Sequence, residues 1–147
     1  FHMFATAWAE MADVIPIMLF QVAYIWFYST QILQLKRISG ILLVIAMFML
    51  AFLFSPIAQY FNGSIMYAPA LFILLILAGL HYYKNKTEKF ILFGASLVFL
   101  LSLTFRSLDM VLCPFTGIGS HFLWHILNGT LMYMLLRAYI KSLQAES

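Results

Sequence analysis

The longest uncharged stretch of the chain decides what it can fold into. Residues 38–83 contain no Asp, Glu, Lys or Arg. A helix needs about 20 residues to cross a bilayer, so this run is long enough for two crossings. The segment SPIAQYFNGS, residues 55–64, divides the run, because Pro56, Asn62 and Gly63 favour a turn. The run therefore predicts two membrane helices joined by a short connection.

Composition extends this prediction to the whole chain. Hydrophobic residues make up 65% and charged residues 9%, whereas soluble domains carry about 25% charge. Three more uncharged runs cover residues 14–35, 90–105 and 110–136. We predict an all-α, polytopic membrane bundle, with residues 1–147 as a single transmembrane domain. Nucleic-acid binding is not expected of so apolar a chain.

Five full membrane helices are predicted, over residues 14–34, 38–55, 65–83, 89–107 and 119–141. Asp13 is a suitable N-cap for the first helix, with Pro16 in its first turn, where a missing N–H is harmless. The sequence begins without Met, so we expect residues 1–6 to end a preceding helix and the N-terminal part of the protein to be missing. The single cysteine, Cys113, excludes an internal disulfide.

The positive charges predict the orientation of these helices. Seven cations fall on one side of the predicted membrane, namely Lys36, Arg37, Lys84, Lys86, Lys89, Arg137 and Lys141. Arg106 is the one Lys or Arg near the other side. Because cytoplasmic loops are enriched in Lys and Arg, we predict a cytoplasmic C-terminus.

This topology brings five ionisable residues to the non-cytoplasmic leaflet: His2, Asp13, Asp109, His121 and His125. The last two are four residues apart, so their side chains share one helical face, about 6 Å apart. This arrangement can bind one metal ion, and three imidazoles with one open position are typical of catalytic zinc. The alternative is that each histidine is hydrogen-bonded to a neighbouring polar group.

Three segments carry a family resemblance. FHMFATAWAEMADVIPI, DMVLC and GSHFLWHILNG together resemble the alkaline ceramidase family, part of a membrane-hydrolase group that includes the adiponectin/progestin-type receptors. The resemblance implies that the five helices are the third to seventh of a seven-helix bundle. It also implies that His2, His121 and His125 bind Zn²⁺ and that Asp13 activates the attacking water. The implied substrate is a ceramide-like membrane lipid.

Several of these residues have a simpler interpretation as well. Asp13 can be an N-cap alone. Asp109 and Cys113 match a D-x-x-x-C pattern of the family, but a capping carboxylate and a buried small thiol explain them too. Cys113 can also pair with a cysteine outside this sequence, because the predicted topology puts it on the oxidising side.

Two side chains near the histidine pair also have two interpretations, and a third histidine has one. Trp124 is either a substrate contact or a packing or interfacial aromatic. Asn128 shares the face of the histidine pair, so it is either a hydrogen-bond partner of a metal-binding imidazole or a helix–helix hydrogen bond. His81, beside Tyr82 and Tyr83, is interpreted as part of an interfacial aromatic belt.

Three functions are compatible with this sequence. The leading one is a zinc-dependent hydrolase of carbon–nitrogen bonds in linear amides, which cleaves a ceramide-like lipid to a sphingoid base and a fatty acid. The first alternative is a receptor-like protein in which zinc is structural. The second is a transporter in which the His/Asp cluster relays protons.

Overall fold

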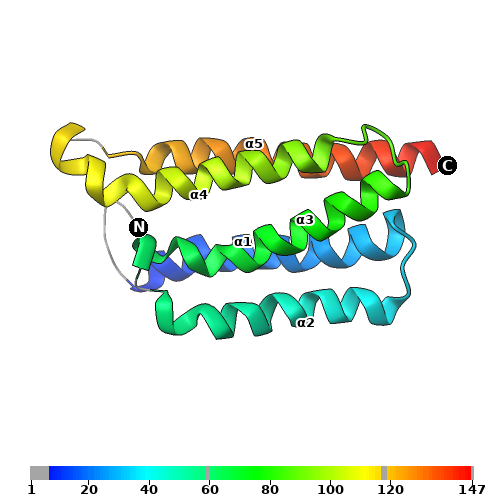
Figure 1. The fold of residues 1–147 in the computed structure, drawn as a ribbon, viewed down its shortest axis with the longest axis horizontal. Helices are drawn as coiled ribbons and strands as arrows, with labels where there is room; N and C mark the ends of the chain where they lie inside the picture. The colour runs from blue at the N-terminus through cyan, green and yellow to red at the C-terminus, as the bar shows by residue number, and fades with distance from the viewer. Residues whose placement is uncertain (1–6, 59, 117–118, 147) are drawn as a thin grey trace.

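Five long helices alternate in direction along the chain (Figure 1). The computed structural model describes the backbone of residues 7–58, 60–116 and 119–146. Within these ranges there is no β-strand, so the predicted all-α class is confirmed. The helices are α1 (Ala7–Phe27), α2 (Arg37–Phe54), α3 (Ala68–Tyr83), α4 (Ile91–Thr116) and α5 (His121–Glu146).

The connections follow the turn signals of the sequence. The predicted break inside the uncharged run is confirmed: two 3₁₀ segments, Ser55–Ile57 and Tyr60–Tyr67, separate α2 from α3. Pro56 lies in the first of them, and Gly63 has a φ of +74° in the second. At the other end of the bundle, α1 continues into a π-helical turn, Tyr28–Ile32, before the chain turns toward α2.

Four stretches of helix are long and apolar enough to cross a membrane: Val14–Ile32, Arg37–Ile57, Gly63–Tyr83 and Ile91–Asp109. They support an integral membrane protein, with four candidate spans among the described residues. The fifth predicted helix is present as α5, but His121, His125, Asn128 and Arg137 make it more polar than the other four.

The start of α1 differs from the prediction. The helix begins at Ala7, so Asp13 lies in its second turn and Pro16 in its interior. The predicted N-cap at Asp13 and first-turn position of Pro16 are therefore wrong. Good helix formers in the segment AWAEMA start the helix about two turns earlier. Pro16 then leaves the carbonyl of Ala12 without its usual i+4 donor.

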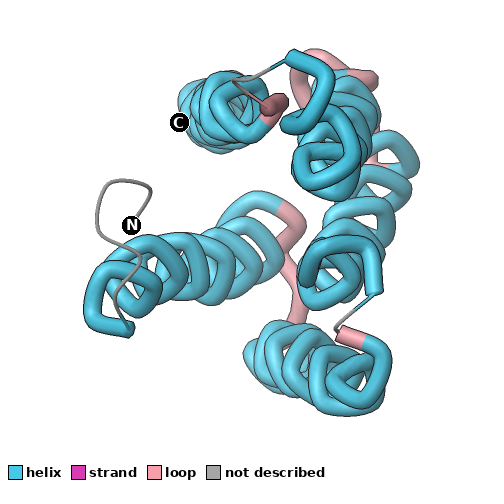
Figure 2. Tube along the Cα trace, turned by 90° about the vertical axis from the view of Figure 1, so that its left-hand side faces the viewer, coloured by secondary structure: helices cyan, strands magenta, loops and turns pink. Residues whose placement is uncertain are grey.

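Viewed end-on, α5, α4, α3 and α2 follow one another around an arc, and α1 lies across from α5 (Figure 2). The closest packing is between α4 and α5, and α3 packs against α4. Several large, fully buried side chains lie toward the end formed by the α1–α2 and α3–α4 connections, namely Tyr28, Ile32, Leu33, Leu77 and Leu92. The bundle is therefore closed at this end.

The closed end also holds the predicted cation cluster. Lys84 Nζ donates to the carbonyl of Leu33 at 2.5 Å, which joins the two connections. Arg137 of α5 reaches the α3–α4 connection, where its Nε donates to Glu88 Oε2 at 2.9 Å. The remaining cation, Arg106, lies in the C-terminal half of α4, beside Trp124 of α5.

His81 does not belong to an interfacial belt. Its side chain is fully buried, whereas its neighbours Tyr82 and Tyr83 are 48% and 81% exposed. Tyr28 Oη lies 2.6 Å from His81 Nδ1, and His81 Nε2 lies 3.4 Å from the carbonyl oxygen of Glu88. With the ring proton on Nε2 both contacts are satisfied, and the Tyr28 hydroxyl donates to Nδ1. His81 ties α3 to the π-helical turn.

Candidate functional site

The histidine pair lies in the first two turns of α5, at the end of the bundle opposite the cation cluster (Figure 1). The ring centroids of His121 and His125 are 5.0 Å apart, and the ring planes make an angle of 64°. This agrees with the predicted sharing of one helical face. The His121 side chain is 19% exposed and that of His125 is more open. The His125 ring is thus open to a metal ion or a substrate, whereas the Nε2 atom of His121 is buried.

Trp124 packs against both histidines. Its ring centroid is 5.0 Å from that of His121 and 4.5 Å from that of His125. The side chain is 1% exposed, which favours its interpretation as a packing aromatic. Trp124 therefore acts as a rigid wall behind the pair.

Asp109, near the end of α4, caps α5. Its Oδ1 accepts hydrogen bonds from the backbone N–H groups of Ser120, at 2.7 Å, and His121, at 2.9 Å. Its Oδ2 lies 3.7 Å from His121 Nδ1. The capping interpretation of Asp109 is thus confirmed, and the same carboxylate also lies beside the His121 ring. A carboxylate behind one ring nitrogen is the usual support of a metal-binding histidine, because it orients the ring and leaves the other nitrogen for the metal.

The connection before α5 is shaped to admit this cap. Gly119 has a φ of +71°, and a Cβ added there would lie 2.4 Å from Asp109 Oδ1. Only glycine tolerates both conditions. The neighbouring Ser120 hydroxyl donates to the carbonyl of Phe105 at 2.6 Å, which fixes the connection to α4. Gly119 and Ser120 therefore position His121 through the backbone.

Arg106 is a part of this site that was not predicted from the sequence. Its guanidinium carbon lies 4.7 Å from the Trp124 ring centroid and 5.1 Å from that of Tyr67. Both distances are within the range of a cation–π contact. The signal in the sequence was a single cation on an otherwise uncharged side of the helices. Arg106 joins α4, α5 and the 3₁₀ segment before α3 behind the histidine pair.

The structure decides between the two interpretations of Asn128 and excludes one interpretation of Cys113. Ser102 Oγ donates to Asn128 Oδ1 at 2.9 Å, so Asn128 makes a helix–helix hydrogen bond between α4 and α5. Cys113 is exposed, so its interpretation as a buried thiol is wrong. Its Cβ lies 3.7 Å from the position of a Cβ on Gly119, which places the thiol beside the same connection.

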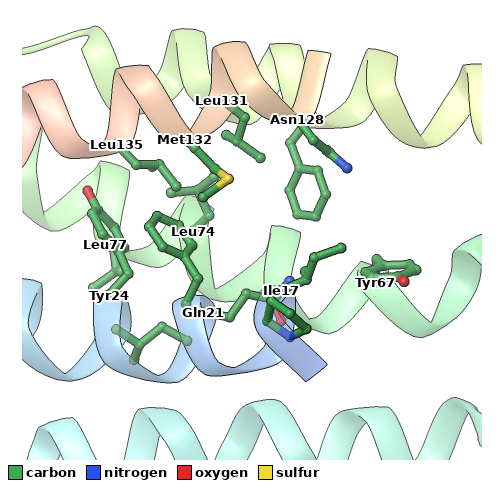
Figure 3. A pocket seen from close by; sticks show the side chains of 15 residues that line it. Ile17, Gln21, Tyr24, Tyr67, Leu74, Leu77, Asn128, Leu131, Met132 and Leu135 are labelled. Atoms are coloured by element: carbon green, nitrogen blue, oxygen red, sulfur yellow. The ribbon is translucent and has the colours of Figure 1, made fainter. Parts of the chain in front are cut away.

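A cavity of about 180 Å³ lies between α1, α3 and α5 (Figure 3). Its lining is almost entirely apolar, and most of it comes from α1 and α5. From α1 come Pro16, Ile17, Phe20, Gln21, Tyr24 and Ile25, and from α5 Asn128, Leu131, Met132 and Leu135. Tyr67, Ala70, Leu74, Leu77 and Phe99 complete the wall.

The α5 wall of the cavity continues the helical face of the histidine pair. Residues 121, 125, 128, 132 and 135 follow one another at spacings of four and three, which keep side chains on one face. The last three line the cavity. The histidine pair therefore lies at the end of the cavity wall, one to two turns beyond Asn128.

The α1 wall has the same relation to Asp13. Residues 13, 17, 20 and 24 are also spaced by four, three and four, and the last three line the cavity. The backbone thus puts Asp13 on the cavity face of α1, one turn beyond Ile17, at the end of the bundle that holds the histidine pair. The side chain of Asp13 and all of His2 lie outside the described part of the chain.

The predicted metal ligands are consequently brought together only in part. Asp109, Trp124, His121 and His125 form one contiguous cluster. Among the side chains that the structure describes, no three His, Cys, Asp or Glu residues are arranged to bind a metal ion. The chain matches no protein-family model, no curated protein and no solved structure.

Proposed function

We propose that this protein is a zinc-dependent hydrolase of N-acyl membrane lipids, of the ceramidase type. One observation carries the proposal: the faces of α1 and α5 that bear Asp13 and the histidine pair continue into the walls of a single apolar cavity. An apolar cavity beside polar groups at its end suits a lipid whose chain is buried while its amide remains near those groups.

The donor set agrees with zinc. His121 and His125 present two adjacent imidazoles, and imidazole suits zinc better than it suits Mg²⁺ or Ca²⁺. Asp109 next to His121 Nδ1 provides the carboxylate support that metal-binding histidines use. His2 is the third ligand implied by the family resemblance. When bound, zinc supplies a Lewis acid and lowers the pKa of its water.

The chain's own residues have distinct tasks in this proposal. Asp13 takes a proton from the attacking water as a general base. The carbonyl carbon gains the hydroxyl of that water, the C–N bond breaks, and the proton goes to the leaving nitrogen, which yields a fatty acid and an amine. Asp109 positions His121. The apolar wall from Ile17 to Tyr24 binds the hydrocarbon chain of the lipid and excludes water.

The proposal includes an orientation in the membrane. The closed end with its seven cations faces the cytoplasm, as the positive-inside rule expects. The histidine pair then belongs to the opposite leaflet. In the family numbering, α1 to α5 would be the third to seventh helices of the bundle, with α5 as a fifth span.

Zinc analysis and lipid hydrolysis by the purified full-length protein test the proposal together. We expect about one zinc per chain and release of fatty acid from a ceramide or a related N-acyl lipid. His121→Ala or His125→Ala should lose both zinc and turnover, because each removes a ligand. Asp13→Asn should keep zinc and lose most turnover.

Glu88→Gln is the matched control, since it makes the same change of carboxylate to amide at the other end of the bundle. It should keep both zinc and turnover. Zinc without hydrolysis of any N-acyl lipid would reject the hydrolase and favour a receptor with structural zinc. A protein without zinc would reject the metal site and favour a proton relay.

A further inference from the structure

Tyr24 places a buried hydroxyl in the wall of the apolar cavity. Its side chain is 8% exposed, and its Oη has no hydrogen-bond partner among the described residues. Burying a hydroxyl without a hydrogen-bond partner has a cost in folding free energy. Phenylalanine would give the same ring without this cost, and Phe20 does so one turn earlier on the same face. The hydroxyl therefore needs a partner that the described residues do not provide.

The orientation of Tyr24 is fixed by its neighbours. Its ring stacks on Phe20 at 5.9 Å and on Tyr28 at 5.0 Å between centroids. Tyr28 lies in the closed end, and its hydroxyl contacts His81. Figure 3 shows the Tyr24 hydroxyl projecting from α1 toward the α5 side of the cavity, near Leu135. The stacked rings leave Tyr24 little freedom to turn its hydroxyl elsewhere.

The depth of this hydroxyl follows from helix geometry. Tyr24 is eleven residues beyond Asp13 on α1, a distance of about 16 Å at 1.5 Å per residue. Leu135 is ten residues beyond His125 on α5, a distance of about 15 Å. Both helices therefore put Tyr24 at the far end of the cavity, well separated from the histidine pair.

We propose that the cavity selects a lipid chain carrying a hydroxyl group in its distal half, which hydrogen-bonds Tyr24. A hydroxyl is the matching group because each partner can donate or accept. Gln21, one turn before Tyr24 on the same wall, offers a further donor and acceptor beside the chain's path. The inference rests on the proposed function only in that it puts the amide of the lipid at the histidine end.

Binding of fatty acids to the purified full-length protein tests this without requiring turnover. Three acids of equal length serve as probes: an unsubstituted one, one with a hydroxyl beside the carboxyl, and one with a hydroxyl in the distal half. The variant is Tyr24→Phe, which keeps the stacked ring. Tyr83→Phe, at an 81% exposed position, is the control that removes a tyrosine hydroxyl elsewhere.

We expect the ratio of affinities for the distal-hydroxy and unsubstituted acids to fall about fivefold from the wild type to Tyr24→Phe. The ratio should not change in Tyr83→Phe. The acid with its hydroxyl beside the carboxyl should show no dependence on Tyr24. The proposal would be overturned if the ratio of affinities for the distal-hydroxy and unsubstituted acids were the same in wild type and Tyr24→Phe. It would also be overturned if Tyr24→Phe weakened the binding of both hydroxy acids equally.

The two proposals fail in different ways. If the hydrolase proposal is wrong but the hydroxyl is recognised, the binding ratio still falls in Tyr24→Phe while no lipid is cleaved. If hydroxyl recognition is wrong, lipid is cleaved and the ratio stays constant. The unfolding midpoint of Tyr24→Phe should equal or exceed that of the wild type, which shows that any loss of preference is not a loss of folding.

Discussion

Asp109 accepts a hydrogen bond from the backbone N–H of His121 at 2.9 Å, while its other carboxylate oxygen lies 3.7 Å from the His121 ring. One side chain thus caps α5 and stands behind one of its candidate metal ligands. The start of the helix and the position of the imidazole are therefore set by the same contact between α4 and α5. A helix N-terminus also favours a negative charge.

Replacing Asp109 separates these two roles. Asp109→Ala removes the acceptor of two backbone N–H groups and should lower the free energy of unfolding by about 1–2 kcal/mol. Asp109→Asn keeps an oxygen acceptor and should retain most of that stability. Both variants lack the charge beside His121, so both should bind zinc about 10- to 100-fold more weakly if the metal proposal holds. Thermal unfolding and zinc titration in detergent measure the two effects, and an unchanged midpoint in Asp109→Ala would reject the cap.

Gly119→Ala should also displace the cap. The added Cβ would lie 2.4 Å from Asp109 Oδ1, and alanine is strained at a φ of +71°. We expect a loss of at least about 1–2 kcal/mol. The loss should be smaller in the Asp109→Ala background, where the clash is absent and only the backbone strain remains. Gly129→Ala is the control, because a Cβ there meets nothing within 4 Å.

The buried pair of Tyr28 and His81 predicts a stability effect at the other end of the bundle. His81→Leu removes the imidazole nitrogen that the fully buried Tyr28 hydroxyl contacts and should cost about 1–3 kcal/mol. Adding Tyr28→Phe should recover part of this loss, because both polar groups are then gone. Zinc content should not change in either variant, since the histidine pair is at the opposite end. Loss of zinc together with stability would contradict this separation.

The ion pair of Glu88 and Arg137 predicts a dependence on acid. The hydrogen bonds from Arg137 lower the pKa of Glu88 below its usual value of 4.5. Since the pKa is lower in the folded state, the stabilisation is fully present above about pH 4.5 and is lost as the pH falls through the folded value. The unfolding midpoint of Glu88→Gln should approach that of the wild type in this acidic window. If the difference between the unfolding midpoints of wild type and Glu88→Gln stayed constant down to acid pH, the ionised carboxylate of Glu88 would not be the source of the stabilisation.

The sequence by itself determined the helical architecture. Residues 38–83 are uncharged and long enough for two crossings, and in lipid such a segment must satisfy its backbone hydrogen bonds internally, as a helix does. Pro56 and Gly63 marked where this run turns. The spacing of His121 and His125 likewise fixed their shared face, since helix periodicity acts over a few residues. The same local reasoning erred at Asp13, where helix formers upstream outweighed a possible cap.

Only the tertiary structure decided which polar groups meet. Asp109 and His121 are joined across a connection, Tyr28 and His81 across fifty-three positions, and Arg106 is held by rings from two other segments. His81, predicted to lie in an interfacial belt, is accordingly buried in the core, and Tyr24, to which no role was predicted, lies in the wall of a cavity. Periodicity gives the face of a helix on which a residue lies, but burial and hydrogen bonding depend on which other helix covers that face.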